Sequence, residues 1–251
     1  MEKNIKYDFK GKTCLVTGAG KGLGWEVSKI FIKAGANVVC ASRTLYPEVT
    51  EELKPYGDRV SFIKADVSIE EEVKQVIKVA IEKYNRVDIL INNAGIAQGG
   101  KVEDLSVGVW DRVMAVNVRS QFLCIREVLP FMKNNRYGKI VNVSSIAGRD
   151  KSIILGSPYS TSKAAIIGLT RAVAAEVAPF NINVNCICPS QHRTPMLKEV
   201  LSPDIEKKLL QKIPLGYIAS PEQIANVILF LATDEANYMS GSVVDVNGGQ
   251  L

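Results

Sequence analysis

Several features that mark particular classes of protein are missing from the sequence. No apolar run reaches the ~18 residues that would predict a membrane span. The formal charge is +5, but the basic residues form no tract, so nothing favours nucleic-acid binding. The first ten residues are polar and charged and do not resemble a signal peptide. These absences predict a soluble cytoplasmic protein, and the small positive charge is compatible with an anionic ligand.

The five cysteines show neither the spacing of metal ligands nor a framework of pairs. Cys14, Cys40, Cys186 and Cys188 lie in short apolar runs typical of strands. We therefore expect buried free thiols in a reducing compartment and no metal site.

What the chain does contain is a regular alternation of strand-like and helical patterns. The helical patterns lie at 25–34, 69–84, 109–132, 159–177 and 224–232, and the strand-like runs at 13–17, 37–41, 60–65, 87–91, 139–143, 183–188 and 242–246. This alternation predicts an α/β fold with one doubly wound, seven-stranded parallel sheet and helices on both faces. Because no linker or repeat interrupts it, we expect a single domain over residues 1–251.

A glycine-rich turn, Gly-Ala-Gly-Lys-Gly-Leu-Gly from Gly18 to Gly24, follows the first strand and opens the first helix. Glycines let a backbone approach a pyrophosphate closely, and a helix N-terminus offers free N–H groups. The turn therefore predicts nucleotide binding, although a glycine turn can also be only a tight connection.

Polar or special residues stand at the carboxyl ends of five predicted strands: Gly18, Asp66, Asn92, Ser145 and Pro189. In open parallel sheets, ligands bind just beyond these ends. Their convergence predicts the position of the site.

Tyr159 and Lys163 lie four residues apart at the start of a predicted helix and would share one face of it. A nearby ammonium lowers the pKa of a phenol, so the pair could form a proton donor that works at neutral pH. The same spacing is common on ordinary helices, so the pair alone decides nothing.

Taken together, the ordered motifs are similar to those of the short-chain dehydrogenase/reductase family over essentially the whole chain. The motifs are Thr17-Gly18-x-x-x-Gly22-x-Gly24, Asp66-Val67, Asn92-Asn93-Ala94-Gly95, Asn117, Ser145, Tyr159-x-x-x-Lys163 and the strand that ends at Pro189.

The resemblance implies four catalytic residues. Tyr159 would be the general acid or base, and Lys163 would lower its pKa and hold the nicotinamide ribose. Ser145 would bind the substrate oxygen, whereas Ser144 could be only a polar residue at the strand end. Asn117 would be linked through water to Lys163; without the resemblance it would be taken for an ordinary helix residue.

The resemblance also implies the nucleotide contacts. Asp66 would bind the adenine amino group, Asn92 the adenosine ribose side and Thr194 the carboxamide. The other implied contacts are Gly18, Lys21, Gly22, Leu23, Gly24, Ser42, Arg43, Val67, Ala94, Gly95, Asn117, Tyr159, Lys163, Pro189, Ser190 and His192.

The charge at the end of the second strand bears on which nucleotide binds. Relatives that prefer NAD carry an acid there, but this chain has Ser42 followed by Arg43, with Lys21 nearby in the glycine turn. Cations can pair with a 2′-phosphate that an acid would repel. The pattern favours NADP(H), with NAD as a possible second cofactor.

Two residues depart from the family pattern. Ser190 stands where relatives usually have glycine, and His192, the only histidine, stands where they have an aliphatic residue. His192 could contact cofactor or substrate or could be an ordinary packed residue, and the departures make Thr194 a less secure assignment.

Residues 190–216 contain apolar stripes interrupted by prolines and predict a two-helix lid over the site. The lid could line the pocket or merely pack on the body. Candidate substrate contacts are Ser145, Ile96, Gln98, Ile146, Ile153, Ile154, Gln191 and His192, a mixed set that selects no substrate.

We therefore expect an NADP(H)-dependent oxidoreductase that interconverts a small ketone and a secondary alcohol. The alternatives are a 3-oxoacyl-thioester reductase, a sugar or polyol dehydrogenase, and, in another class, a non-catalytic nucleotide sensor. Relatives that act on acyl carrier protein use two arginines for docking; Arg136 matches one, but Phe180 replaces the other. The resemblance further implies a homotetramer.

Overall fold

The computed structural model describes residues 7–44, 46–150, 156–194, 197 and 201–251. Seven parallel strands form one sheet in the order β3-β2-β1-β4-β5-β6-β7. Their bounds are β1 (Thr13–Thr17), β2 (Asn37–Ser42), β3 (Val60–Lys64), β4 (Ile89–Asn92), β5 (Gly138–Val143), β6 (Ile182–Pro189) and β7 (Val243–Val246). The predicted doubly wound sheet is confirmed.

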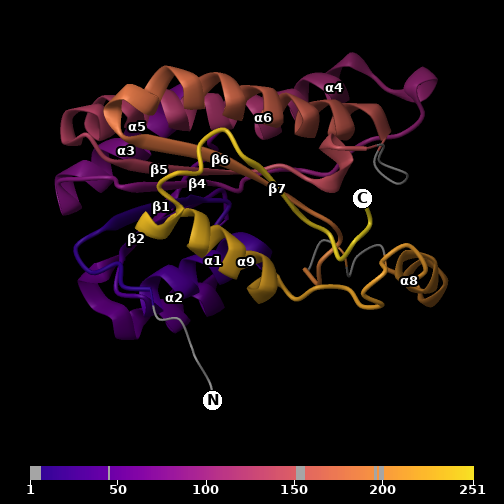
Figure 1. Cartoon of the computed structure of the whole chain (residues 1–251), viewed down its shortest axis with the longest axis horizontal. Coiled ribbons are helices and arrows are strands. Elements are labelled where there is room, and N and C mark those ends of the chain that lie inside the picture. The colour runs from indigo at the N-terminus through magenta and orange to yellow at the C-terminus, as the bar shows by residue number, and fades with distance from the viewer. Residues whose placement is uncertain (1–6, 45, 151–155, 195–196, 198–200) are drawn as a thin grey trace.

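Helices cover both faces of this sheet, as Figure 1 shows. On one face lie α1 (Gly22–Lys33), α2 (Pro47–Leu53) and α9 (Pro221–Leu231). On the other lie α3 (Glu70–Tyr84), α4 (Val107–Met114), α5 (Ser120–Asn135) and α6 (Gly156–Val177). The remaining helix, α8 (Pro203–Leu210), lies beyond the end of β6.

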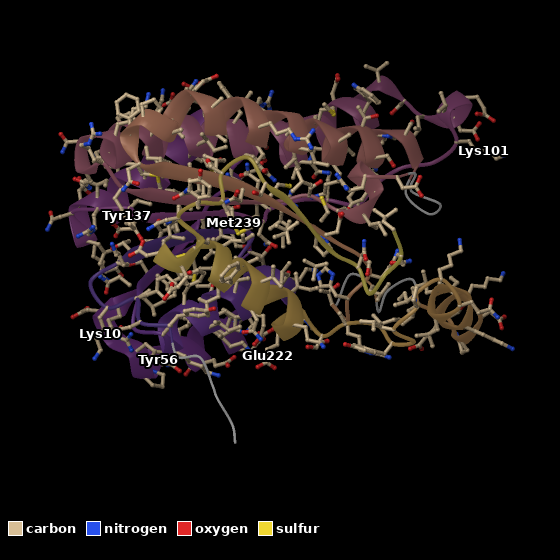
Figure 2. The ribbon with its side chains drawn as sticks, viewed as in Figure 1. Lys10, Tyr56, Lys101, Tyr137, Glu222 and Met239 are labelled. Atoms are coloured by element: carbon tan, nitrogen blue, oxygen red, sulfur yellow. The ribbon has the colours of Figure 1, made fainter. Side chains whose placement is uncertain are left out.

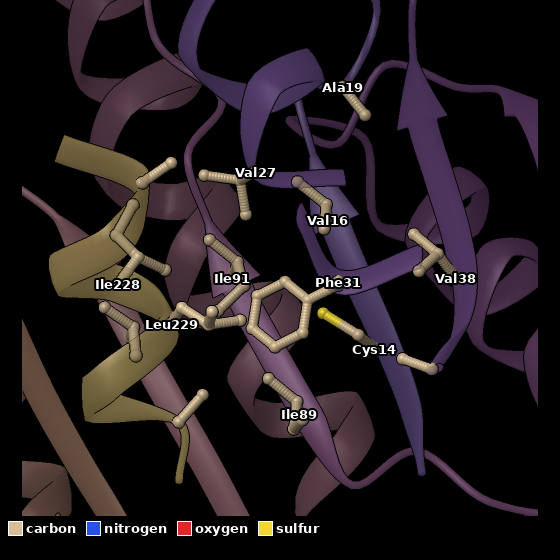
Figure 3. Close-up of a cluster of buried hydrophobic side chains, with 14 of the residues drawn as sticks. Cys14, Val16, Ala19, Val27, Phe31, Val38, Ile89, Ile91, Ile228 and Leu229 are labelled. Carbon is tan, nitrogen blue, oxygen red and sulfur yellow. The ribbon is translucent and has the colours of Figure 1, made fainter. Parts of the chain in front are cut away.

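The strands are buried on both sides, and successive residues enter opposite layers of the core. Cys14 and Val16 pack with Phe31 of α1, whereas Leu15 packs in the layer under α3, α5 and α6. Figure 3 shows Phe31 among side chains of β1, β4 and α9. Burying a side chain of this size stabilises the fold by roughly 1.5–3 kcal/mol. The near-continuous apolar runs of the sequence are therefore explained by helices on both faces.

The strand order reverses between β1 and β4, which are neighbours in the sheet but far apart in sequence. Connections leave these two strands in opposite directions, so a crevice opens beyond their carboxyl ends. The glycine turn follows β1, and the Asn92–Gly95 motif begins at the last residue of β4. The fold thus brings the two predicted nucleotide-binding segments to one place.

Local structure differs from the sequence prediction in a few elements. The single helix predicted at 109–132 is interrupted by a π-turn at Ala115–Arg119 between α4 and α5. The helix predicted from 159 begins at Gly156. Helix α2 was not predicted, because its seven residues carry only two buried apolar side chains, Val49 and Leu53.

The predicted lid at 190–216 is only partly covered by the described residues, because 195–196 and 198–200 lie outside them. In the described part Leu197 is helical and α8 is a complete helix, and the proposed two-helix lid remains a prediction.

Candidate active site

The structure brings Ser145, Tyr159 and Lys163 together beyond the ends of β5 and β6. Ser145 begins the loop after β5, and its side chain is hydrogen-bonded to that of Tyr159. Lys163 lies one helical turn further along α6, with Nζ 5.6 Å from the centre of the Tyr159 ring. Tyrosine, serine and lysine therefore form one cluster, as the sequence predicts.

Asn117 occupies the π-turn and is fully buried, which excludes an ordinary surface position. Its Oδ1 accepts from the Ile96 N–H at 2.8 Å, and its Nδ2 donates to the Ile96 carbonyl at 3.0 Å. The same Nδ2 donates to Ser162 Oγ at 2.9 Å, and Ser162 Oγ donates to the Tyr159 carbonyl at 2.7 Å. Asn117 therefore ties the loop after β4 to the catalytic turn of α6.

The Lys163 side chain is only 4% exposed, and its Nζ donates to the Val143 carbonyl at 2.9 Å. Burial lowers the pKa of Lys163 to about 8, and the thiols of Cys186 and Cys188 oppose this shift. A β-carbon on Gly95 would lie 3.6 Å from Nζ, so the backbone after β4 runs beside the ammonium. An ammonium has three N–H donors, and two remain for a ligand such as a ribose diol.

The expected lowering of the Tyr159 pKa by Lys163 stays a prediction. Burial raises the pKa of Tyr159, and the hydrogen bond with Ser145 only partly opposes this rise. Tyr159 therefore holds its proton at neutral pH, as a general acid requires.

The turn after β1 packs closely against the segment after β4 and opens a helix whose first amides are uncapped. Gly18 has φ +67°, and a β-carbon there would lie 2.9 Å from the Ala94 Cα atom. A β-carbon on Gly24 would lie 2.4 Å from Asn93 Nδ2. Helix α1 begins at Gly22 and has no side-chain cap from Lys21, so its first amide groups are available to a phosphate. The residues present therefore fit a dinucleotide.

The sequence prediction missed the contacts that hold the two nucleotide-binding segments together. Thr17 Oγ1 accepts from the amides of Asn93 and Ala94, both at 3.1 Å. Asn93 Nδ2 donates to the carbonyls of Thr17 at 3.0 Å and Gly18 at 3.3 Å. Thr17 belongs to the glycine motif, so the signal was present, but its role depends on β1 and β4 being neighbours.

The predicted contact of Asn92 with the adenosine ribose side stays a prediction. The Asn92 side chain is buried and donates to Asn142 Oδ1 at 2.9 Å, because Asn92 is the last residue of β4 rather than a loop residue. Any ribose contact from this position would have to come from the main chain.

Asp66 follows β3, and its Oδ1 accepts from the Ser68 amide at 3.0 Å and from Ser68 Oγ at 2.6 Å. Its Oδ2 lies 3.5 Å from Arg112 and 3.9 Å from Arg43. Burial raises the pKa of Asp66, but the Ser68 hydrogen bonds and then the two guanidinium groups outweigh it, so the net shift is downward. Arg112 of α4 was not predicted and adds a second cation at this end of the crevice.

Ser42 lies close to the glycine turn, since a β-carbon on Gly20 would be 2.6 Å from its Oγ. Arg43 follows it with a half-exposed side chain, and Leu23 and Val67 are buried nearby in the core. A small hydroxyl and a loosely paired cation thus stand where relatives that prefer NAD carry an acid.

Comparison with known proteins gives the same result as this geometry. The family model described as Enoyl-(Acyl carrier protein) reductase matches residues 18–250. The 3-oxoacyl-[acyl-carrier-protein] reductase FabG of Thermotoga maritima is 37% identical, covering 96% of this chain and 98% of the relative. The 7alpha-hydroxysteroid dehydrogenase of Escherichia coli K12 is also 37% identical, covering 98% and 96%.

The chain belongs to the short-chain dehydrogenase/reductase family. A solved structure of 3-ketoacyl-(acyl-carrier-protein) reductase from Brucella melitensis complexed with NADH superposes with a TM-score of 0.87 at 34% identity. That match covers 96% of this chain and 98% of the other. As in the family, this chain is an oxidoreductase that uses a nicotinamide cofactor and acts on carbonyl and alcohol groups.

The two departures from the family pattern are accommodated without strain. Ser190 does not have a left-handed backbone, so its position does not need the glycine usual in the family. Its amide donates to the Val246 carbonyl at 3.0 Å and continues the pairing with β7. Replacing glycine therefore costs little here.

His192 is held by both its main chain and its ring. Its backbone bridges to Ala219, and Nδ1 lies 3.0 Å from the Ser190 carbonyl. Burial lowers the pKa of His192, so the ring is neutral at neutral pH. Because a carbonyl only accepts, Nδ1 carries the proton and Nε2 is left as an acceptor.

The remaining predicted contacts of cofactor and substrate lie in the loops that follow β4, β5 and β6. Thr194 Oγ1 accepts from the Leu197 amide at 3.4 Å, so its hydroxyl braces its own loop. Gln191 has a buried Oε1 with no hydrogen-bond partner among the described residues, Ile96 and Ile146 are partly buried, and Gln98 is exposed. Ile153 and Ile154 lie outside the described residues.

Two absences concern only the described ranges. None of their helices has the length and apolar character needed to cross a membrane. Nor do they contain three or more histidine, cysteine or acidic side chains placed to hold a metal ion.

Proposed function

We propose that this protein is an NADP(H)-dependent reductase of small ketones, working reversibly as a secondary-alcohol dehydrogenase. The observation that carries the proposal is the cluster of Ser145, Tyr159 and buried Lys163, together with the glycine turn at the uncapped start of α1. A phenol that stays protonated and is hydrogen-bonded to a serine has what is needed to protonate a carbonyl oxygen.

Bound nicotinamide would supply the hydride for the carbonyl carbon. Tyr159 Oη gives its proton to the carbonyl oxygen, which becomes the hydroxyl of a secondary alcohol. Ser145 Oγ holds that oxygen, and Lys163 holds the ribose and stabilises the phenolate left on Tyr159. In alcohol oxidation the same phenolate takes the proton back.

The preference for NADP(H) rests on charge at the end of β2. Arg43 Nη1 lies 3.9 Å from Asp66, too far for a tight pair, so its guanidinium can turn to a 2′-phosphate at little cost. One structural neighbour is complexed with NADH and an equally similar one has NADP bound, so overall likeness does not decide the nucleotide.

The substrate proposal rests on the surface near α5. Arg136 is already engaged, since Nη2 donates to the Pro179 carbonyl at 3.1 Å. Lys133 stacks on Phe180, with Nζ 4.6 Å from the ring centre, where carrier-binding relatives would have a second arginine. We therefore favour a small free carbonyl compound over a carrier-bound acyl chain.

The decisive experiment measures kcat/KM for a panel of small ketones, secondary alcohols and hydroxysteroids with NADPH and with NADH. The same assay includes a 3-oxoacyl group on acyl carrier protein at low and high salt. We expect turnover of free ketones with NADPH and little salt dependence. A strong, salt-sensitive preference for the carrier-bound substrate would replace our proposal with a 3-oxoacyl reductase.

We further propose a homotetramer formed through α4, α5 and α6. Trp110 of α4 and Phe122 and Phe131 of α5 are large apolar side chains left 37–46% exposed in the single chain. Sedimentation or light scattering would give the mass of the assembly directly.

We also propose one domain over residues 1–251. The five buried free thiols support a cytoplasmic location.

A further inference from the structure

The end of β5 and the middle of α6 are joined by two reciprocal hydrogen bonds. Lys163 Nζ donates to the Val143 carbonyl at 2.9 Å. In return, Ser144 Oγ donates to the Lys163 carbonyl at 2.7 Å. We name Val143, Ser144 and Lys163, together with Gly148, the serine clasp.

Gly148 closes the clasp from the other side of the loop. A β-carbon there would lie 2.6 Å from the Lys163 carbonyl carbon and 2.8 Å from the Ala164 nitrogen. No side chain fits into that space, so the loop backbone rests directly on the Lys163–Ala164 peptide. The loop that carries Ser145 therefore touches α6 both before and after the catalytic serine.

Ser144 is itself fixed to the sheet. Its side chain is 3% exposed, and its amide donates to the Ile187 carbonyl of β6 at 2.9 Å. Its hydroxyl also contacts the thiol of Cys188. These partners hold the Ser144 hydroxyl in one orientation. The position of the sheet therefore determines where Ser144 bonds the Lys163 carbonyl of the helix.

We propose that Ser144 is a positioning residue that sets the separation of Ser145 and Tyr159 and keeps water from Lys163. This inference rests on the catalytic roles proposed above. Ser144 contacts neither substrate nor cofactor in this scheme. It acts through the Lys163 peptide, one turn from Tyr159, and through its covalent neighbour Ser145. A displacement of about 1 Å between reacting groups can cost up to about a hundredfold in rate.

The titratable groups around the clasp define what a pH profile would report. Lys163 faces Tyr159 on α6, and Cys186 and Cys188 face Lys163 from β6, with Arg149 and Asp245 near Cys188. The hydrogen bond between the two thiols raises the pKa of Cys186 and lowers that of Cys188. Because burial holds the Lys163 pKa at about 8 and the Tyr159 pKa high, water entering an opened clasp should raise the first and lower the second.

The first test is Ser144→Ala in the full chain, assayed for ketone reduction with NADPH. We expect kcat to fall roughly tenfold to a hundredfold, with the KM for NADPH unchanged within about twofold. The alkaline limb of the kcat profile, which reports loss of the Lys163 proton, should move to higher pH, and Cys188→Ala shows how much of that limb belongs to the thiol. The control is Thr170→Ala. It also removes a buried hydroxyl that donates to a carbonyl of α6, at 2.8 Å, but this carbonyl belongs to Ile166, about two turns beyond Tyr159.

The second test is Gly148→Ala, which opens the clasp by sterics and keeps every hydroxyl. Gly148→Ala should reproduce the loss in kcat and the shift of the alkaline limb. If Ser144→Ala does not fold, Gly148→Ala alone tests the positioning role. Normal kcat and an unshifted limb in the folded variants would overturn the inference. So would an equal loss and shift in Thr170→Ala, which would make the effect general destabilisation. If Tyr159→Phe were instead active, the proposed function itself would fail.

Discussion

The two ends of the sheet carry the same residue types, but their side chains are bonded differently. At the amino end lie Arg86, Tyr137 and Lys139, and at the carboxyl end lie Arg43, Tyr159 and Lys163. Figure 2 labels Tyr137 at the end of the molecule opposite α8. The amino end of the sheet can therefore serve as the control for the carboxyl end.

At the amino end the polar groups bond to one another. Lys139 is 1% exposed, and its Nζ donates to Asn183 Oδ1 at 2.8 Å and to Asn237 Oδ1. The Tyr137 hydroxyl donates to Asp234 at 3.0 Å. Arg86 bonds both carboxylate oxygens of buried Asp88, at 2.7 and 2.5 Å.

At the carboxyl end Lys163 is about as buried as Lys139, but Lys163 and Arg43 hold fewer bonds than their counterparts, while Tyr159 keeps one, to Ser145. Lys163 has one hydrogen bond to the described part of the chain, and Arg43 has only a contact of 3.9 Å. A buried group left with spare donors costs stability, and proteins keep such groups where a ligand uses them. Bonding, rather than burial, distinguishes the site from the scaffold.

The largest effect is expected from the two tyrosines. Tyr159→Phe should lower kcat by roughly 10²–10⁴-fold while nucleotide still binds, because the proton donor is lost. Tyr137→Phe should leave kcat unchanged and cost only the hydrogen bond to Asp234. Steady-state kinetics and nucleotide titration check both variants, and near-normal turnover by Tyr159→Phe would remove the basis of the assignment.

The two lysines should separate activity from stability. Lys163→Met should reduce kcat by at least roughly a hundredfold, since the group that stabilises the phenolate is gone. Lys139→Met should keep kcat per folded molecule and lower the free energy of unfolding by about 1–3 kcal/mol, because Asn183 and Asn237 lose their donor. Urea denaturation and kinetics on both variants test this. A loss of kcat in Lys139→Met together with a normal kcat in Lys163→Met would contradict the comparison.

Stability should depend on pH through Lys163. Its folded pKa is about 8, below the reference value of 10.5. Below pH 8 the folded state holds a proton that burial disfavours, at a cost of about 3 kcal/mol. Between these two pKa values the unfolded chain binds more protons, so the free energy of unfolding rises with pH. Urea denaturation from pH 7 to 10 should show this rise in the wild type and its loss in Lys163→Met.

The smallest effect is expected from the two arginines. Arg43→Ala should raise the KM for NADPH about ten- to a hundredfold and leave that for NADH unchanged, because only NADPH has a 2′-phosphate. Arg86→Ala should affect both nucleotides equally and instead destabilise the fold, since Asp88 would be left buried without its cation. Equal effects of Arg43→Ala on both nucleotides would show that Arg43 does not read the phosphate.

The fold could be predicted from the sequence because its signals are local and repeated. The bounds of β1 follow from one apolar run, and the parallel, doubly wound sheet follows from the alternation of strands and helices. The positions of Tyr159, Lys163 and Ser145 follow from motifs next to those elements. Each of these inferences needs only the neighbouring residues.

The rest depends on contacts between distant segments. The inward turn of the Asn92 side chain could not be predicted, because Asn142, its partner, lies 50 residues away. The raised pKa of Tyr159 depends on burial by other elements, which spacing does not report. Ser144 looked like an ordinary strand-end serine until the carbonyl of Lys163 was found beside it.

The π-turn at Ala115–Arg119 makes this helix intolerant of changes in length. A π-turn carries one residue more than an α-turn, so deleting one residue here would restore regular α-helical winding and leave the core face of α5, with Leu123 and Val128, in place. Asn117 would then lose the position from which it bonds Ile96 and Ser162. Single-residue insertions and deletions should therefore be rejected along this stretch even where every substitution is accepted.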